Sequence, residues 1–121
     1  MTHPAMTPSY ARRRMEQALL SLAKDATAQV QDELDFVDVC FELRDTFENS
    51  WGIMLECGDM ADRASLEDLD IHSLREHLNV LSRSPWAWEE SALSTDPGWA
   101  HARRLATALL NEWKQNRVEL D

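Results

Sequence analysis

Apolar residues recur at helical spacing over the first quarter of the chain. Five of them lie three or four positions apart: Met15, Leu19, Leu22, Ala26 and Val30. This spacing places them along one face of a helix. Thr7 followed by Pro8 is typical of a helix start, because threonine caps free N–H groups and proline fits the first helical position. The pattern predicts a helix that ends near Gln29, preceded by a disordered arm over residues 1–7.

The most hydrophobic stretch of the chain follows, and its polar start also favours a helix. Asp32 and Glu33 suit a first turn, where negative charge complements the helix dipole. We expect the apolar residues behind them to be buried: Phe36, Val37, Cys40, Phe41, Leu43 and Phe47. Polar residues and glycine further on allow a break. The pattern therefore leaves open whether segments 32–49 and 50–63 form one helix or two.

Two more amphipathic segments complete the pattern. The first has apolar residues Ile71, Leu74, Leu78 and Leu81, and the second has Trp99, Ala102, Ala106, Leu109 and Trp113. Cap signals precede the first segment at Ser65 with Asp68 and again at Asp70, and Pro85 stops it after Arg83. Asp96 with Pro97 predicts the start of the second. The residues between the two segments are the longest loop we expect.

These elements predict an all-α protein, a compact bundle or orthogonal array of four to five amphipathic helices. Each helix has one apolar stripe that the other helices must cover. A chain of 121 residues with 44% hydrophobic residues is large enough for one core. We expect a single helical domain over residues 1–121, with short loops because the chain has only three glycines and four prolines.

The formal net charge of −10 is concentrated in the middle of the chain. Residues 32–70 contain thirteen acidic and two basic residues, whereas the segments before and after them are close to neutral. Nucleic acids and anionic membranes attract clustered lysine and arginine, so this balance argues against direct binding to either. It favours a basic protein as the partner.

Four acidic residues lie on one predicted helix face: Asp35, Asp38, Glu42 and Asp45. Their intervals of three and four residues form an acidic stripe on the side opposite the apolar residues, and Glu48 flanks it. If the helix continues, Glu56, Asp59 and Asp62 would lengthen the acidic surface. We also expect the three arginines of residues 12–14 to pair with acidic neighbours elsewhere, because they oppose the dipole of their own helix.

The acidic stripe has three interpretations. It can be a solvated face that keeps the protein soluble, a docking surface for a basic cleft, or a set of metal ligands. A docking surface gains from long-range charge attraction, which raises association rates. Metal binding has little support, because the Glu-x-x-His pairs of di-iron bundles and the spaced residues of a calcium loop are absent.

Motifs for catalysis are also absent from the sequence. It contains no Gly-x-Ser-x-Gly, no phosphate-binding loop and no plausible pairing of cysteine with histidine. We expect a protein that is not an enzyme and needs no cofactor. Cys40 and Cys57 fall within predicted helices and are expected to be buried free thiols, although a redox pair is the alternative. The first residues lack a secretory h-region, so we expect a cytoplasmic protein.

Trp86 and Trp88 stand apart from the other tryptophans because they lie in the predicted loop. Such aromatic residues either clamp a loop onto the core or stand exposed as binding anchors, and tryptophan is enriched at interface hot spots. The other three tryptophans fall on helical apolar stripes and are expected in the core.

These observations lead to a functional hypothesis. We expect a non-catalytic binding protein that neutralises or masks a basic partner, such as a toxin or a nucleic-acid-binding protein. Its partner-binding residues would be the acidic stripe with Glu48, and Trp86 or Trp88. In size, charge and helical content the chain is similar to the small acidic immunity proteins and antitoxins with which bacteria block toxic nucleases. The alternatives are a nucleic-acid mimic that inhibits a restriction or CRISPR complex, a helical subunit of a larger assembly, and a carboxylate metalloenzyme.

Overall fold

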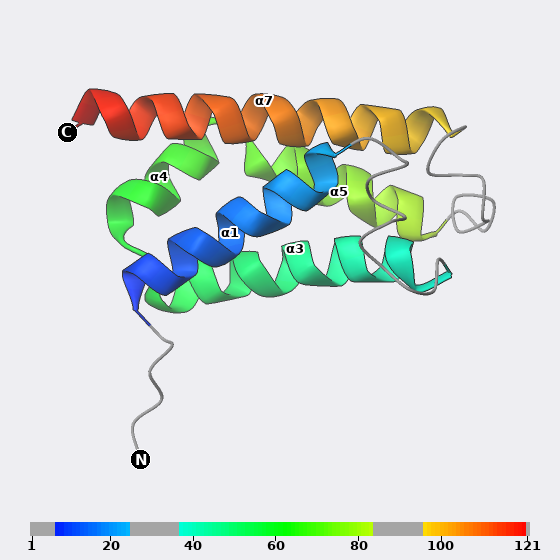
Figure 1. Cartoon of the computed structure of the whole chain (residues 1–121), viewed down its shortest axis with the longest axis horizontal. Helices are drawn as coiled ribbons and strands as arrows, with labels where there is room; N and C mark the ends of the chain where they lie inside the picture. The colour runs from blue at the N-terminus through cyan, green and yellow to red at the C-terminus, as the bar shows by residue number, and fades with distance from the viewer. Residues whose placement is uncertain (1–6, 25–36, 84–95, 121) are drawn as a thin grey trace, which may run out of the picture.

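The computed structural model describes residues 7–24, 37–83 and 96–120, and within these ranges it contains only helices (Figure 1). The helices are α1 (Pro8–Ala23), α3 (Val37–Cys57), α4 (Met60–Asp68), α5 (Ile71–Ser82) and α7 (Pro97–Leu120). α1 packs between α3 and α7, α5 packs on α7, and α4 closes one end of the bundle. The expected all-α bundle is thus confirmed.

The first helix begins as expected and ends earlier. Thr7 accepts a hydrogen bond from the Tyr10 N–H at 3.1 Å and caps α1 ahead of Pro8. The helix ends at Ala23, because Lys24 adopts an extended conformation, so the predicted end at Gln29 is wrong. The apolar spacing predicted too long a helix. It identifies the face that would be buried and not the residue at which the backbone leaves the helix. Ala26 and Val30 lie outside the described residues.

The middle segment forms one helix up to Cys57 and a second one after it. α3 passes without interruption through the polar residues that could have ended it, because Ser50 and Trp51 are both buried in the core. The break comes at Gly58, where an added Cβ would lie 2.5 Å from the carbonyl oxygen of Met54. Asp59 then accepts a hydrogen bond from the Asp62 N–H at 2.8 Å and caps α4.

The start of α5 corrects one cap prediction. Ser65 and Asp68 lie inside α4 and do not cap a helix, whereas Asp70 is the N-cap of α5. Asp70 has a φ of 65°, a left-handed conformation that aspartate tolerates better than most residues, and it accepts a hydrogen bond from the Ser73 hydroxyl at 2.6 Å. The four predicted apolar residues of α5 are all buried: Ile71, Leu74, Leu78 and Leu81.

The last helix follows its predicted pattern closely. The Gly98 N–H donates to the Asp96 carboxylate at 2.6 Å, and Pro97 is the first helical residue. The predicted stripe is fully buried: Trp99, Ala102, Ala106, Leu109 and Trp113. Among the described residues, Trp51 and the two tryptophans of α7 are the largest buried side chains. None of the described helices combines the length and the apolar character needed to cross a membrane.

Candidate functional site

The solvent-facing side of α3 carries the acidic stripe. We call Glu42, Asp45, Asn49, Gly52 and Glu56 the outer face of α3, since these residues lie three or four apart and all are exposed. The opposite side of the helix is buried against the core through Leu43, Phe47, Trp51 and Met54. Packing on one side and solvent on the other turn the outer face into a ridge about 21 Å long at 1.5 Å per residue.

The remaining residues of the predicted site are distributed unevenly. Asp38 lies in α3 four residues before Glu42, so its position in the helix belongs to the same face. Asp35, Trp86 and Trp88 lie outside the described residues. The structure therefore brings together the C-terminal half of the predicted acidic stripe and does not test the aromatic anchors.

The carboxylates of the outer face are largely unpaired. The described residues offer no ion-pair partner to Glu42 or Glu56. Asp45 has a side chain that is 56% exposed and meets Arg44 only at 3.9 Å, the limit of an ion pair. Exposed pairs of this kind contribute little free energy. These charges are therefore available to a partner from solution.

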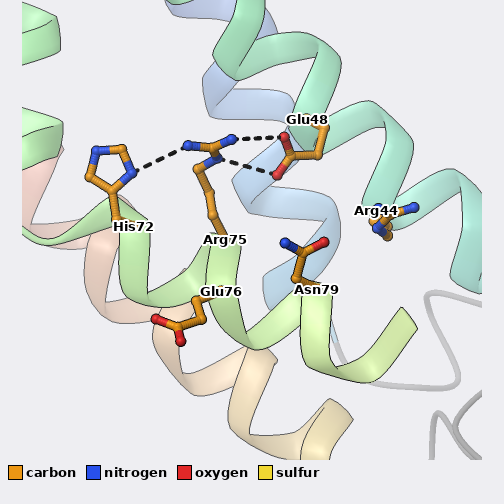
Figure 2. Close-up of a pocket in the computed structure, with 6 residues that line it drawn as sticks. All are labelled: Arg44, Glu48, His72, Arg75, Glu76 and Asn79. Carbon is orange, nitrogen blue, oxygen red and sulfur yellow. Dashed lines mark hydrogen bonds and ion pairs between the residues drawn. The ribbon is translucent and has the colours of Figure 1, made fainter. Parts of the chain in front are cut away.

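Glu48, which we predicted as part of the binding surface, is already engaged at the edge of the outer face. Figure 2 shows its carboxylate facing Arg75 of α5, which donates two hydrogen bonds at 3.3 and 3.2 Å. A third donor of the Arg75 guanidinium lies 3.3 Å from Nδ1 of His72. This bidentate ion pair links α3 to α5, so Glu48 is engaged in the packing of these two helices.

A polar hollow of about 260 Å³ lies beside this ion pair (Figure 2). It is lined by Arg44, Glu48, His72, Arg75, Glu76 and Asn79. Two guanidinium groups balance two carboxylates there, so the hollow marks a neutral border of the acidic face. Sequence reasoning missed it because its residues come from two helices, and no local spacing connects them.

A second group of acidic residues, Asp59 and Asp62, is paired within the bundle. Asp62 has a side chain only 2% exposed, and it accepts hydrogen bonds from Arg12 Nε at 2.9 Å and Trp113 Nε1 at 3.1 Å. Arg12 also lies 3.5 Å from Asp59. The expected pairing of Arg12 is confirmed, whereas the expected extension of the acidic surface to Asp62 is wrong. Asp62 follows the break at Gly58, and α4 turns it into the bundle.

The hydrogen bond to Asp62 raises the pKa of Arg12, and the negative charges of nearby acidic residues act in the same direction. These interactions favour the charged form of the guanidinium in the folded protein. This arrangement links α1, α4 and α7 through one buried carboxylate, and we call it the Asp62 network.

The remaining candidate groups form no reactive cluster among the residues described. Cys57 is a partly buried free thiol whose Sγ donates to the Thr7 carbonyl at 3.6 Å, while the side chain of Cys40 is not described. His77 Nε2 lies 2.7 Å from the Gly98 carbonyl oxygen and packs edge-on against His101. The described part of the chain contains no group of three or more potential metal ligands.

Comparison with known proteins adds no relative. No family model, no curated protein and no solved structure matches this chain. The outer face of α3, with its geometry and charge, is therefore the feature on which a functional conclusion must rest.

Proposed function

We propose that this chain is a non-catalytic acidic protein that binds and masks a basic protein partner, in the manner of an immunity protein or antitoxin that blocks a toxic nuclease. The observation that supports the proposal is the outer face of α3, where Glu42, Asp45 and Glu56 are exposed on one ridge. A basic cleft shaped for a nucleic-acid backbone would attract this ridge, and its occupation would exclude the nucleic acid.

Within the described residues, these carboxylates have no ion pair closer than the 3.9 Å contact of Asp45 with Arg44. Like charges on one helix face repel each other by a few tenths of a kcal/mol per pair. The buried Asp62 and the half-buried Glu48 have cationic partners within the bundle, whereas Glu42 and Glu56 have none among the described residues. A basic partner would convert this repulsion into attraction and would also accelerate association.

The distribution of charge favours an inhibitor over a nucleic-acid mimic. A mimic needs carboxylates along much of its surface at phosphate-like separations. Here the acidic ridge belongs to α3, while other helices expose basic residues, including Arg13 on α1 and Arg104 on α7. One acidic surface on an otherwise mixed protein fits a single basic cleft better than it fits a channel that encloses nucleic acid.

Affinity capture from a lysate of the organism that encodes the chain tests the proposal. The test variant combines Asp35→Asn, Asp38→Asn, Glu42→Gln and Asp45→Asn. We expect the wild type to capture a basic protein at low salt, with less capture at moderate salt because exposed charges are screened. The test variant should lose the captured protein while it keeps its helical circular dichroism spectrum.

A matched control removes the same number of charges elsewhere. Glu67→Gln, Asp68→Asn, Glu76→Gln and Glu112→Gln combined neutralise four exposed carboxylates on α4, α5 and α7. This control should still capture the partner. Equal loss with both variants would mean that only total charge matters, and unchanged capture by the test variant would mean that the ridge is only a solvated face.

A further inference from the structure

Gly52 is the one glycine of the chain whose presence the fold does not explain. An added Cβ at Gly58 would lie 2.5 Å from the Met54 carbonyl oxygen, and at Gly98 it would lie 2.5 Å from Leu81 Cδ2. At Gly52 it would meet no atom within 4 Å, and the backbone there does not have a positive φ. The chain itself therefore leaves room for a Cβ at this position.

Glycine at this position is also unfavourable for the helix. Gly52 lies well inside α3, which runs from Val37 to Cys57. Glycine is the poorest helix former after proline, because its backbone loses the most conformational freedom on folding. A residue that the fold does not need and that the helix disfavours points to a requirement from outside the chain.

The surroundings of Gly52 indicate what that requirement is. Gly52 lies near the middle of the outer face of α3, between Asn49 and Glu56, and Asp45 lies two turns before it. Leu55, which is 46% exposed, is its neighbour three residues on. The outer face of α3 therefore lacks a side chain at Gly52, near its middle. Carboxylates lie before and after this position along the helix, and the apolar side chain of Leu55 lies beside it.

We propose that a basic helix of the partner crosses α3 at Gly52. The absence of a side chain lets the second helix approach closely, as small residues do at other close helix crossings. Lysine or arginine on either side of the crossing would then reach Asp45 and Glu56, and an apolar residue would contact Leu55. This inference rests on the proposed function, since it identifies the part of the basic partner that occupies the ridge.

A defined probe tests this geometry with the full chain. The probe is a stapled helical peptide of about 18 residues, long enough at 1.5 Å per residue to cover the outer face. It carries a line of alanines flanked by lysines, and a second peptide with glutamate for lysine is its control. Titration followed by amide NMR shifts should show binding of the lysine peptide alone, with the largest changes around Gly52.

Gly52→Leu places a bulky side chain at the proposed crossing, and Ala108→Leu does the same at an exposed position on α7. Gly52→Leu should weaken peptide binding about tenfold or more while its Tm rises by about 3–5 °C, since leucine favours the helix. Ala108→Leu should bind like the wild type. Equal affinity for Gly52→Leu and wild type, shift changes centred elsewhere, or no binding of the lysine peptide would each overturn the crossing.

These outcomes remain distinct from those of the capture experiment. If the charge-neutralised variant loses its partner but Gly52→Leu retains full affinity for that partner and for the peptide, the proposed function stands and the crossing at Gly52 is wrong. If neutralisation leaves capture unchanged, the proposed function itself fails.

Discussion

The two acidic regions of this protein use the same functional group in opposite ways. In the Asp62 network the carboxylate is buried and receives hydrogen bonds from Arg12 and Trp113. On the outer face of α3, Glu42 and Asp45 are exposed, and the described part of the chain gives them at most one weak ion pair, between Asp45 and Arg44. A buried charge must be paired inside the molecule, whereas an exposed charge is solvated by water and remains accessible to a binding partner.

The difference shows how a strongly acidic chain can combine a stable core with an exposed, negatively charged surface. Only seventeen positions separate Asp45 from Asp62 in the sequence. The turn at Gly58 and Asp59 separates them in space, because it ends α3 and directs α4 across the end of the bundle. Stability and binding can therefore be altered independently, and each substitution below probes one of the two regions or the border between them.

The largest effect is expected in the Asp62 network. Asp62→Ala removes the buried carboxylate that accepts hydrogen bonds from the Trp113 indole N–H and from Arg12, at a cost of about 3 kcal/mol in the free energy of unfolding. Urea denaturation followed by circular dichroism measures this loss. Asp62→Asn retains an acceptor for the indole and should lose less. If Asp62→Ala costs under about 0.5 kcal/mol, the network does not stabilise the fold.

The pKa of Arg12 determines how the stabilisation that Arg12 contributes to the Asp62 network depends on pH. The Arg12 pKa is raised in the folded state by its hydrogen bond to Asp62, so the stabilisation from Arg12 is fully present below its unfolded-state pKa and is lost only as the pH rises through the higher folded-state pKa. The contribution of Arg12 is thus constant across the neutral range. We therefore expect the unfolding free energy to depend on pH between 7 and 9 in the same way in the wild type and in Arg12→Met.

A smaller effect is expected at the border between the two kinds of site. The Glu48 and Arg75 side chains are 37% and 35% exposed, so solvent screens their bidentate ion pair. A double-mutant cycle with Glu48→Gln and Arg75→Met should give a coupling free energy of about 0.5–1 kcal/mol that falls with added salt. A coupling near zero at low salt would show that the pair does not hold α3 to α5.

The smallest effect on stability is expected on the outer face. Glu42→Gln, Asp45→Asn and Glu56→Gln together should change the unfolding free energy by less than about 0.5 kcal/mol, and in the stabilising direction because like charges are removed. Urea denaturation at low salt detects the change. A loss above about 1 kcal/mol would assign these carboxylates to the fold and would remove the contrast with Asp62.

Much of the fold could be predicted from the sequence, because helical periodicity is a local property. The stripe from Trp99 to Trp113 and the stripe from Ile71 to Leu81 identified buried faces correctly. The cap at Asp70 was predicted correctly, whereas the end of α1 and the cap signal at Ser65 with Asp68 were misjudged. A helix end depends on single backbone conformations such as those of Lys24 and Asp70. Periodicity carries no information about these angles.

The candidate site was predictable only in part, for the same physical reason. The exposure of Glu42 and Asp45 follows from their position opposite the apolar side of one helix. The partners of Asp62 and Glu48 come from other helices, and Arg12 is 50 residues away from Asp62 along the chain. Pairing between distant helices requires their arrangement in space, so a sequence shows that such charges exist but not which of them are already neutralised.

The most direct test of the central claim is the dissociation constant of the captured partner for the wild type and for the triple outer-face variant Glu42→Gln, Asp45→Asn and Glu56→Gln. Isothermal titration calorimetry at two salt concentrations would supply it, with equal stability of both proteins confirmed first. We predict at least about tenfold weaker binding for the variant and a weaker dependence on salt. Equal dissociation constants and equal salt dependence would contradict the claim that the outer face of α3 is the binding surface.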